Sequence, residues 1–104
     1  MNYRGSLQLL ILNVLARGPS HGYQIAQHIK RQSRGILDFK EGTLYPTLHG
    51  LERQGYLEAA EAQENGRTRR IYTLTERGQQ LLAAEVQAWR QFVRAVDRNL
   101  EDGA

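Results

Sequence analysis

The stretch that most constrains the fold is residues 41–56, EGTLYPTLHGLERQGY. Leu44, Leu48 and Leu51 recur at i, i+4 and i+7, which places their side chains on one stripe of an α-helix. The opposite side carries Gly42, Pro46, His49, Gly50 and Arg53, with Thr43 and Tyr45 at its margins. A helix that enters a DNA groove needs such a face, because bulky apolar or acidic side chains would hold it away. An ordinary amphipathic helix would show the same leucine stripe, so the neighbouring segments must decide between the two interpretations.

Proline and glycine predict the bounds of this helix. Pro46 has no backbone N–H and belongs in the first turn, where N–H groups are unpaired anyway, so the helix should start between Lys40 and Thr43. Gly55 should end it. Residues 36–40 are expected to be a connector, in which the alternation of Leu37 and Phe39 suits a short strand.

Two further helices are expected upstream. Apolar residues cover nearly the whole circumference of a helix over residues 5–17, which Gly18 and Pro19 should stop. A helix that is apolar all round is buried all round, and in so small a chain one face needs a second surface, which we interpret as a subunit interface. Ser20 is expected to cap the next helix, residues 21–32. Its inner face should comprise Tyr23, Ala26 and Ile29, with Ile25 beside it.

The hydrophobic period changes from helical to alternating after Gly55. Residues 56–62 and 69–74 have the pattern of two strands, and Asn65-Gly66 between them is a strong hairpin signal because both residues tolerate positive φ. The side chains expected to face the core are Leu57, Tyr72 and Leu74.

Three arginines crowd the hairpin turn and the return strand: Arg67, Arg69 and Arg70. Their like charges repel one another unless an anion lies nearby, so they either bind one or form a solvated tip. The first strand carries carboxylates at Glu58, Glu61 and Glu64, so the electrostatic reach of the hairpin depends on the arginines pointing outward.

Thr75 should cap a last helix that runs from residue 76 to about residue 101. At ~1.5 Å per residue this helix is roughly 38 Å long, too long for so small a domain to cover. Its apolar residues recur in alternating steps of four and three, as in a coiled-coil seam: Leu82, Val86, Trp89, Val93, Val96 and Leu100. We expect this seam, together with Leu9 and Leu12 of the first helix, to form one dimer interface.

Composition fits a single intracellular domain. The 104 residues are 40% hydrophobic and include no cysteine, which excludes disulfides and thiolate metal sites and suits a reducing cytoplasm. No apolar run approaches membrane-spanning length, so we expect a soluble, cytoplasmic protein. Residues 1–75 hold 10 Lys+Arg against 6 Asp+Glu (+4), and residues 76–104 hold 4 against 5 (−1). The basic excess therefore lies with the helix over residues 41–56 and its flanks.

An enzyme is not expected. His21 and His28 are seven residues apart on one helix, His49 lies elsewhere, and neither paired carboxylates nor a glycine-rich phosphate loop accompanies them. A metal-sensing site on His21 and His28 would need an acidic third ligand that the sequence does not suggest. We therefore expect no catalytic residue, cofactor or metal.

Three helices followed by a hairpin with a basic tip form the winged helix-turn-helix arrangement, in which the third helix enters the major groove. We expect a mainly α chain with a small β-hairpin: residues 1–75 as the DNA-binding domain and residues 76–104 as a dimerisation helix, in one compact unit. Three segments carry a family resemblance: LNVLARGPSHGYQI at 12–25, EGTLYPTLHGLERQGYL at 41–57 and GRTRRIYTLTERG at 66–78. On these segments the chain resembles the PadR family of bacterial transcriptional regulators, specifically its short members with a single C-terminal helix.

We expect a dimeric repressor that binds double-stranded DNA, and a twofold dimer with one groove-reading helix per subunit should bind an inverted-repeat operator. The resemblance implies that Tyr45 and residues 67–69 contact DNA. The residues expected at the DNA are Lys40, Gly42, Thr43, Tyr45, Pro46, Thr47, His49, Arg53, Asn65, Arg67, Thr68 and Arg69. The alternative is a winged helix used as a protein-interaction module. RNA binding is less favoured, because no sheet offers an aromatic stacking platform.

Trp89 lies mid-seam with Phe92 one helical step away, and core packing alone would explain both. Across a twofold axis, however, two indoles are hard to interdigitate, so they would hold the helices apart and leave a flat-walled apolar slot. Asn13, nearly alone as a polar residue on the first helix, would supply a hydrogen bond at the slot's edge. Members of the resembled family with such a helix bind flat aromatic compounds at the dimer centre. We therefore expect Trp89, Phe92 and Asn13 to bind a small planar aromatic effector that releases the repressor.

Overall fold

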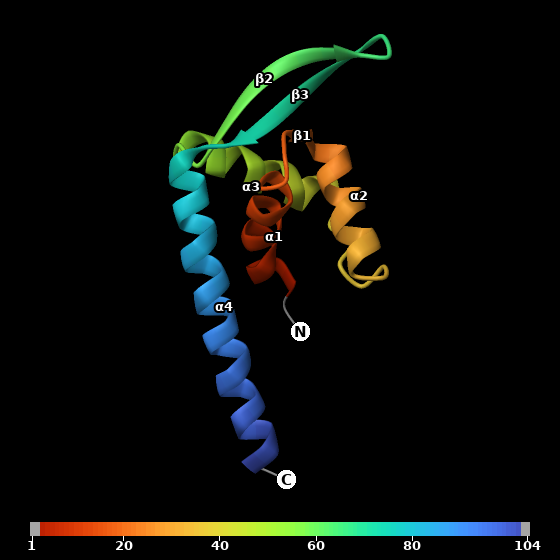
Figure 1. Cartoon of the computed structure of the whole chain (residues 1–104). Helices are drawn as coiled ribbons and strands as arrows, with labels where there is room; N and C mark the ends of the chain where they lie inside the picture. Colours follow the sequence, from red (N-terminus) through yellow and green to blue (C-terminus); the bar gives the residue numbers. More distant parts are fainter. Residues whose placement is uncertain (1–2, 103–104) are drawn as a thin grey trace.

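The computed structural model describes residues 3–102. The elements in chain order are the 3-10 turn η1 (Tyr3–Ser6), α1 (Leu7–Leu15), β1 (Ser20–His21), α2 (Gly22–Gln32), α3 (Glu41–Arg53), β2 (Leu57–Glu64), β3 (Arg67–Leu74) and α4 (Glu76–Asp102). Helices α1, α2 and α3 form a bundle, and the β2–β3 hairpin rises from one end of it (Figure 1). Helix α4 starts at the base of the hairpin and runs in the opposite direction to the hairpin. This is the winged helix-turn-helix with a long C-terminal helix that the sequence predicted.

The core of the bundle is built from aliphatic side chains on all three helices. The least exposed of them are Leu7, Ile11, Leu12, Leu15, Ile25, Ile29, Leu44, Leu48 and Leu51. The leucine stripe of α3 is therefore confirmed, and burying each such side chain contributes about 1.5–3 kcal/mol. On α2 the expected inner face is wrong in one member: Tyr23 is 57% exposed, because Ile25 and Ile29 occupy the buried stripe.

The sheet has three antiparallel strands in the order β1-β3-β2, one more than the predicted hairpin. Asn65 (φ 52°) and Gly66 (φ 78°) form the two-residue turn, as expected. Leu57, Tyr72 and Leu74 face the core, also as expected. The third strand is the two-residue β1, which pairs Ser20 with Tyr72 and His21 with Ile71.

Three local expectations before α3 need correction. The N-cap of α2 is His21, not Ser20: His21 Nδ1 accepts a hydrogen bond from the Gln24 N–H at 3.3 Å, while Ser20 belongs to β1. The connector that contains Leu37 and Phe39 is not a strand, although both side chains pack against the core. Helix α3 starts at Glu41, inside the predicted window, but Pro46 then lies in the second turn rather than the first.

Helix α4 begins where Thr75 caps it, as predicted. The Thr75 hydroxyl accepts a hydrogen bond from the Gly78 N–H at 3.1 Å and donates to the Gly55 carbonyl at 2.8 Å. Gly78 faces the hairpin base so closely that an added Cβ would collide with the Tyr56 carbonyl oxygen. This close approach sets the direction in which α4 leaves the bundle.

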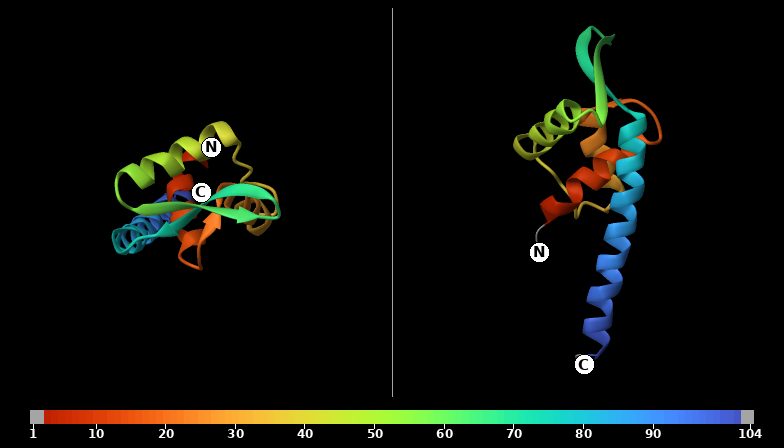
Figure 2. Two further views of the ribbon diagram at one scale, coloured as in Figure 1. Left: turned by 90° about the horizontal axis from the view of Figure 1, so that it is seen from above. Right: turned by 90° about the vertical axis from the view of Figure 1, so that its left-hand side faces the viewer.

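Of the elements that the structure describes, those outside α4 cover only its first turns. Gln8 of α1 donates a hydrogen bond to Glu85 of α4, and Leu82 packs against the core. Beyond this region α4 projects alone, which gives the molecule a long dimension of 56 Å (Figures 1 and 2). Leu12 is 0% exposed within the chain's own core and has no surface to offer a second copy, so the expectation that it lies in a dimer interface is wrong.

Candidate nucleic-acid interface

The outer face of α3 is held outward by the leucine stripe on the opposite side of the same helix. Gly42, Pro46, His49 and Arg53 are all exposed, and among them only Arg53 is a long side chain. In the right-hand view of Figure 2, α3 lies on the side of the bundle away from α4. This face is therefore open to a large partner without interference from the C-terminal helix.

The two threonines predicted at the DNA, Thr43 and Thr47, are half-buried. The Thr47 hydroxyl donates a hydrogen bond to the Thr43 carbonyl at 3.0 Å. Each hydroxyl oxygen can accept as well as donate, so Thr47 keeps an acceptor while its proton is used within the helix.

Tyr45 joins α3 to α2. Its ring is half-buried and lies over Gly22, where an added Cβ would be 2.7 Å from the ring. His49 lies next to it on α3, with the two ring centroids 6.3 Å apart. Only glycine at position 22 permits this approach, so Gly22 helps to set the angle between the two helices of the helix-turn-helix. No sequence pattern indicates this role of Gly22.

The hairpin tip carries the remaining predicted contacts. Asn65, Arg67 and Thr68 are exposed at the end of the projecting wing (Figure 1). Arg69 differs from them: it is half-buried, and its Nε is shielded from solvent with no hydrogen-bond partner in the described structure. Arg67 is therefore the wing arginine most available to an anion.

Lys40 lies exposed at the start of α3 and is tied to the connector before it. Its Nζ is 3.2 Å from Asp38 Oδ2, and Lys30 Nζ of α2 is 3.7 Å from the same oxygen. The hydrogen bond from Lys40 lowers the pKa of the Asp38 carboxyl. Lys40 is thus paired with a carboxylate, whereas Arg53 and Arg67 form no ion pair with any residue of the described range 3–102.

An ion pair fastens the wing to α3. Arg70 Nη2 donates a hydrogen bond to Glu52 Oε2 at 2.6 Å, and the Arg70 guanidinium lies 6.0 Å from the centroid of the buried Tyr72 ring. The hydrogen bond with Glu52 raises the pKa of Arg70, and burial raises the pKa of Tyr72. Of the three clustered arginines, Arg70 therefore has its anion within the chain. No sequence pattern predicts this pair, because its members are 18 residues apart on different elements.

The residues predicted to bind an effector are only partly brought together. Trp89 and Phe92 are neighbours on α4, with ring centroids 6.0 Å apart, and they are 45% and 60% exposed. Asn13 instead lines a groove between α1 and α2 that neither ring borders. Leu9 is half-buried, and Val96 and Leu100 are exposed on the distal part of α4.

The three histidines are separated in the fold. His21 is buried as the cap of α2, with Nε2 3.8 Å from Glu64 Oε1, while His28 lines a pocket between α1 and α2 and His49 lies on α3. Within residues 3–102, His, Asp and Glu side chains nowhere gather in threes in a way that would hold a metal ion. Over the same residues, every helix is too short or too polar to cross a bilayer.

Comparison with known proteins identifies the family. The model of the transcriptional regulator PadR-like family matches residues 11–84. The chain belongs to the PadR-like family of transcriptional regulators. It is 34% identical over 93 residues to the transcriptional regulator Rv3488 of Mycobacterium tuberculosis, a match that covers 89% of this chain and 84% of that relative.

Solved structures agree with this assignment. A transcriptional regulator from Clostridium thermocellum superposes with a TM-score of 0.85 at 27% identity, covering 91% of this chain and 90% of that chain. Bacillus subtilis PadR, solved in complex with operator DNA, superposes with a TM-score of 0.70 at 27% identity, covering 77% of this chain and 46% of that chain. The PadR-like regulator described here thus has the fold of its family.

Proposed function

We propose that this PadR-like regulator is a homodimer that binds an inverted-repeat operator in double-stranded DNA. It represses transcription until a small planar aromatic compound releases it. The single observation that carries the DNA-binding part is the open α3 face beside a projecting wing with a free Arg67. The likeness to Bacillus subtilis PadR, solved in complex with operator DNA, supports it.

In this proposal α3 enters the major groove and the wing reaches the flanking backbone. His49 and Arg53 face the base edges, while the tip residues Asn65, Arg67 and Thr68 face phosphates. Arginine can donate two hydrogen bonds to guanine, and such a pair discriminates between bases by about 1–3 kcal/mol. Phosphate contacts add affinity without sequence preference. Lys40, Gly42, Thr43, Tyr45, Pro46, Thr47 and Arg69 complete the proposed contact surface.

The distal part of α4 provides the dimerisation surface, and residues 76–104 serve as the dimerisation segment of a DNA-binding domain formed by residues 1–75. Trp89, Phe92, Val96 and Leu100 are 45%, 60%, 39% and 69% exposed on one helix. An apolar surface of this extent indicates a partner, because contact with water is unfavourable. Packing of the α4 seam and Leu9 against the same residues of a second copy would cover this apolar surface.

The effector site lies where the two copies of α4 meet. Trp89 and Phe92 of each chain would wall a flat slot, and Asn13 would contribute only if the second copy brought it there, because it lies in the α1–α2 groove within one chain. A ligand in the slot would change the angle between the subunits and hence the spacing of the two α3 helices. Such coupling is typically about 1–3 kcal/mol.

Selection of bound sites from random double-stranded DNA, followed by footprinting, tests the DNA-binding part. A twofold dimer should select an inverted repeat whose half-sites are centred about one helical turn, ~10 bp, apart. Recovery of direct repeats or of a lone half-site would contradict the architecture. Val96→Glu should give folded monomers by analytical ultracentrifugation, because a charge would enter the seam. Gln91→Glu, exposed on the opposite side of α4, is the matched control and should remain dimeric.

Fluorescence tests the effector part, because Trp89 is the single tryptophan in the sequence. An acridine cation should quench its emission and weaken operator binding at the same concentrations. In Trp89→Ala, acridine affinity, followed by acridine fluorescence, and operator release should both fall. If that variant stays dimeric and matches the wild type in both properties, Trp89 only packs the interface.

A further inference from the structure

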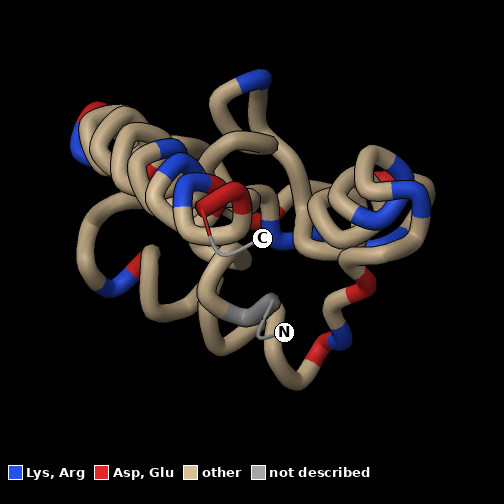
Figure 3. The backbone as a smooth tube through the Cα atoms, turned by 90° about the horizontal axis from the view of Figure 1, so that it is seen from below, with Lys and Arg blue, Asp and Glu red and all other residues tan. Residues whose placement is uncertain are grey.

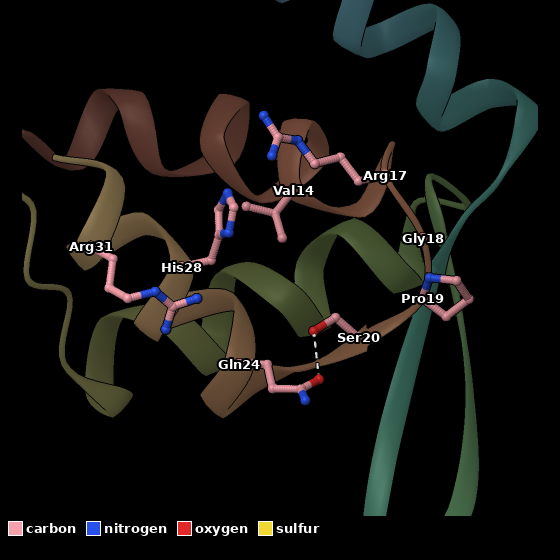
Figure 4. Close-up of a pocket in the computed structure, with 8 residues that line it drawn as sticks. All are labelled: Val14, Arg17, Gly18, Pro19, Ser20, Gln24, His28 and Arg31. Carbon is pink, nitrogen blue, oxygen red and sulfur yellow. Dashed lines mark hydrogen bonds between the residues drawn. The ribbon is translucent and has the colours of Figure 1, made fainter.

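A pocket of about 300 Å³ lies between the C-terminal end of α1 and the outer side of α2. Figure 4 shows Arg17 extending from the turn after α1, and His28 and Arg31 extending from α2, around this opening. The Ser20 hydroxyl and the Gln24 side chain, 3.0 Å apart, form its other edge. In Figure 4 α3 lies behind α1 and α2, so the pocket opens on the side of the domain away from the proposed DNA-reading face.

The pocket is cationic without a compensating carboxylate. No acidic residue lines it, and within residues 3–102 neither Arg17 nor Arg31 forms an ion pair. The reason lies in the sequence: residues 1–37 contain five Lys or Arg residues and no Asp or Glu. Figure 3 shows Lys and Arg gathered on α2 accordingly. Arg31 lies in the last turn of α2 and Arg17 just after the C-terminal end of α1, where a cation is favourable, and both add positive potential to the pocket.

The cationic pocket continues into an apolar one. A second pocket of about 290 Å³ shares Val14, Arg17 and His28 with the first. Its apolar lining comes from Leu10, Val14, Ile29 and Leu37, none of them aromatic. The two together form one groove along α1 and α2, with a charged end and an aliphatic end. Volumes of this size are typical of small-molecule sites.

We propose that this groove binds an aliphatic carboxylate, with the carboxylate held by Arg17 and Arg31 and the hydrocarbon body against Leu10 and Ile29. The planar fork of each guanidinium matches the two oxygens of a carboxylate. The apolar lining contains no Phe, Tyr or Trp ring, which favours a flexible aliphatic body over a flat ring. This site is separate from the aromatic slot proposed at Trp89, and it does not depend on DNA binding or on that effector.

Isothermal titration calorimetry with octanoate tests the site on the full chain. Octanoate should bind saturably at one molecule per chain. Arg17→Gln and Arg31→Gln should each weaken it by about tenfold, the loss expected for one charge-assisted hydrogen bond. Both residues are exposed, so these variants should keep their circular dichroism. 1-Octanol, which lacks the charge, should bind at least ten times more weakly.

Two controls separate the site from nonspecific attraction and from the Trp89 slot. Lys30→Gln removes the same charge from the neighbouring position of α2, but Lys30 lies outside both pockets of the groove and faces Asp38, so octanoate affinity should not change. Trp89→Ala should also leave it unchanged.

Several results would overturn the proposal: no saturable heat with octanoate up to millimolar concentration, equal affinity for 1-octanol, or equal weakening by Lys30→Gln. Failure of octanoate to bind, combined with a shift of the monomer–dimer equilibrium in Arg31→Gln, would instead make the groove part of the subunit interface.

Discussion

Gly78 offers a sharp test of how α4 is attached to the winged domain. An added Cβ would meet the Tyr56 carbonyl oxygen and would lie 2.6 Å from Leu74 Cδ1. Neither neighbour can move freely, because one is backbone and the other is a core side chain. Overpacking of this kind costs about 1–3 kcal/mol. The displacement would also pull the Gly78 N–H from the Thr75 hydroxyl, and losing such a cap costs about 1 kcal/mol.

Gly50 of α3 is the matched control for the same substitution. There the nearest atom to an added Cβ is Arg53 Nη2 at 3.8 Å, an ordinary contact. Gly50→Ala should therefore show only the helix-propensity gain of about 1 kcal/mol. Gly78→Ala should lose about 1–3 kcal/mol after its own propensity gain is counted, so the two variants should differ by roughly 2–4 kcal/mol.

Urea unfolding followed by circular dichroism would measure both variants, at one chain concentration because association adds to apparent stability. With m near the usual ~1–3 kcal/mol/M, the midpoint of Gly78→Ala should fall by about 1 M while that of Gly50→Ala rises. If the two midpoints moved in the same direction, α4 would not approach the hairpin base as described.

Three further predictions concern the wing, α3 and the core. Arg67→Ala should weaken binding to all DNA sequences alike and take about one unit from the slope of log affinity against log salt, whereas Arg53→Ala should relax sequence preference by about 1–3 kcal/mol. Fluorescence anisotropy over a salt series separates the two, and the reverse pattern would exchange their roles. Tyr72→Phe should be neutral or stabilising at pH 7, because among residues 3–102 no group lies in hydrogen-bonding geometry to the buried Tyr72 hydroxyl. Burial raises the pKa of Tyr72 in the folded state above its value of ~10 in the unfolded state. The stability that the neutral hydroxyl provides is therefore fully present below pH ~10 and is lost as pH rises through the pKa of the folded state. Thermal unfolding should therefore show that Tyr72→Phe loses less stability than the wild type between pH 7 and a pH above ~10. Equal losses in the two proteins would contradict the burial of the Tyr72 hydroxyl.

The elements that the sequence predicted well are those whose cause lies within a few residues. The stripe of Leu44, Leu48 and Leu51 is a period along one helix. The turn at Asn65 and Gly66 needs only two residues that accept positive φ. The proposed DNA surface was predictable for the same reason, because the outward face of α3 is the complement of its buried stripe.

The residues that the sequence misassigned depend on neighbours far away in the chain. Leu12 looked like interface because an all-apolar α1 in a small chain suggested a second subunit, but the chain's own core absorbs it. Ser20 is of a residue type that often caps helices, but residues 20–21 pair with β3, and His21 is the N-cap of α2. The strand β1 has only two residues, too few to show the alternation of apolar and polar residues that predicts a strand.

By itself, the sequence determined the order of the four α-helices and the two hairpin strands, the buried stripe of α3, the wing turn and the apolar seam of α4. These follow from backbone preference and hydrophobic period, which act over one or two turns of chain. Only the tertiary structure decided that Arg70 pairs with Glu52, that Gly22 admits Tyr45, and that Gly78 meets the base of the wing. Each of these contacts joins elements brought together by burial of the common core, and no local pattern encodes which side chains will meet when that core forms.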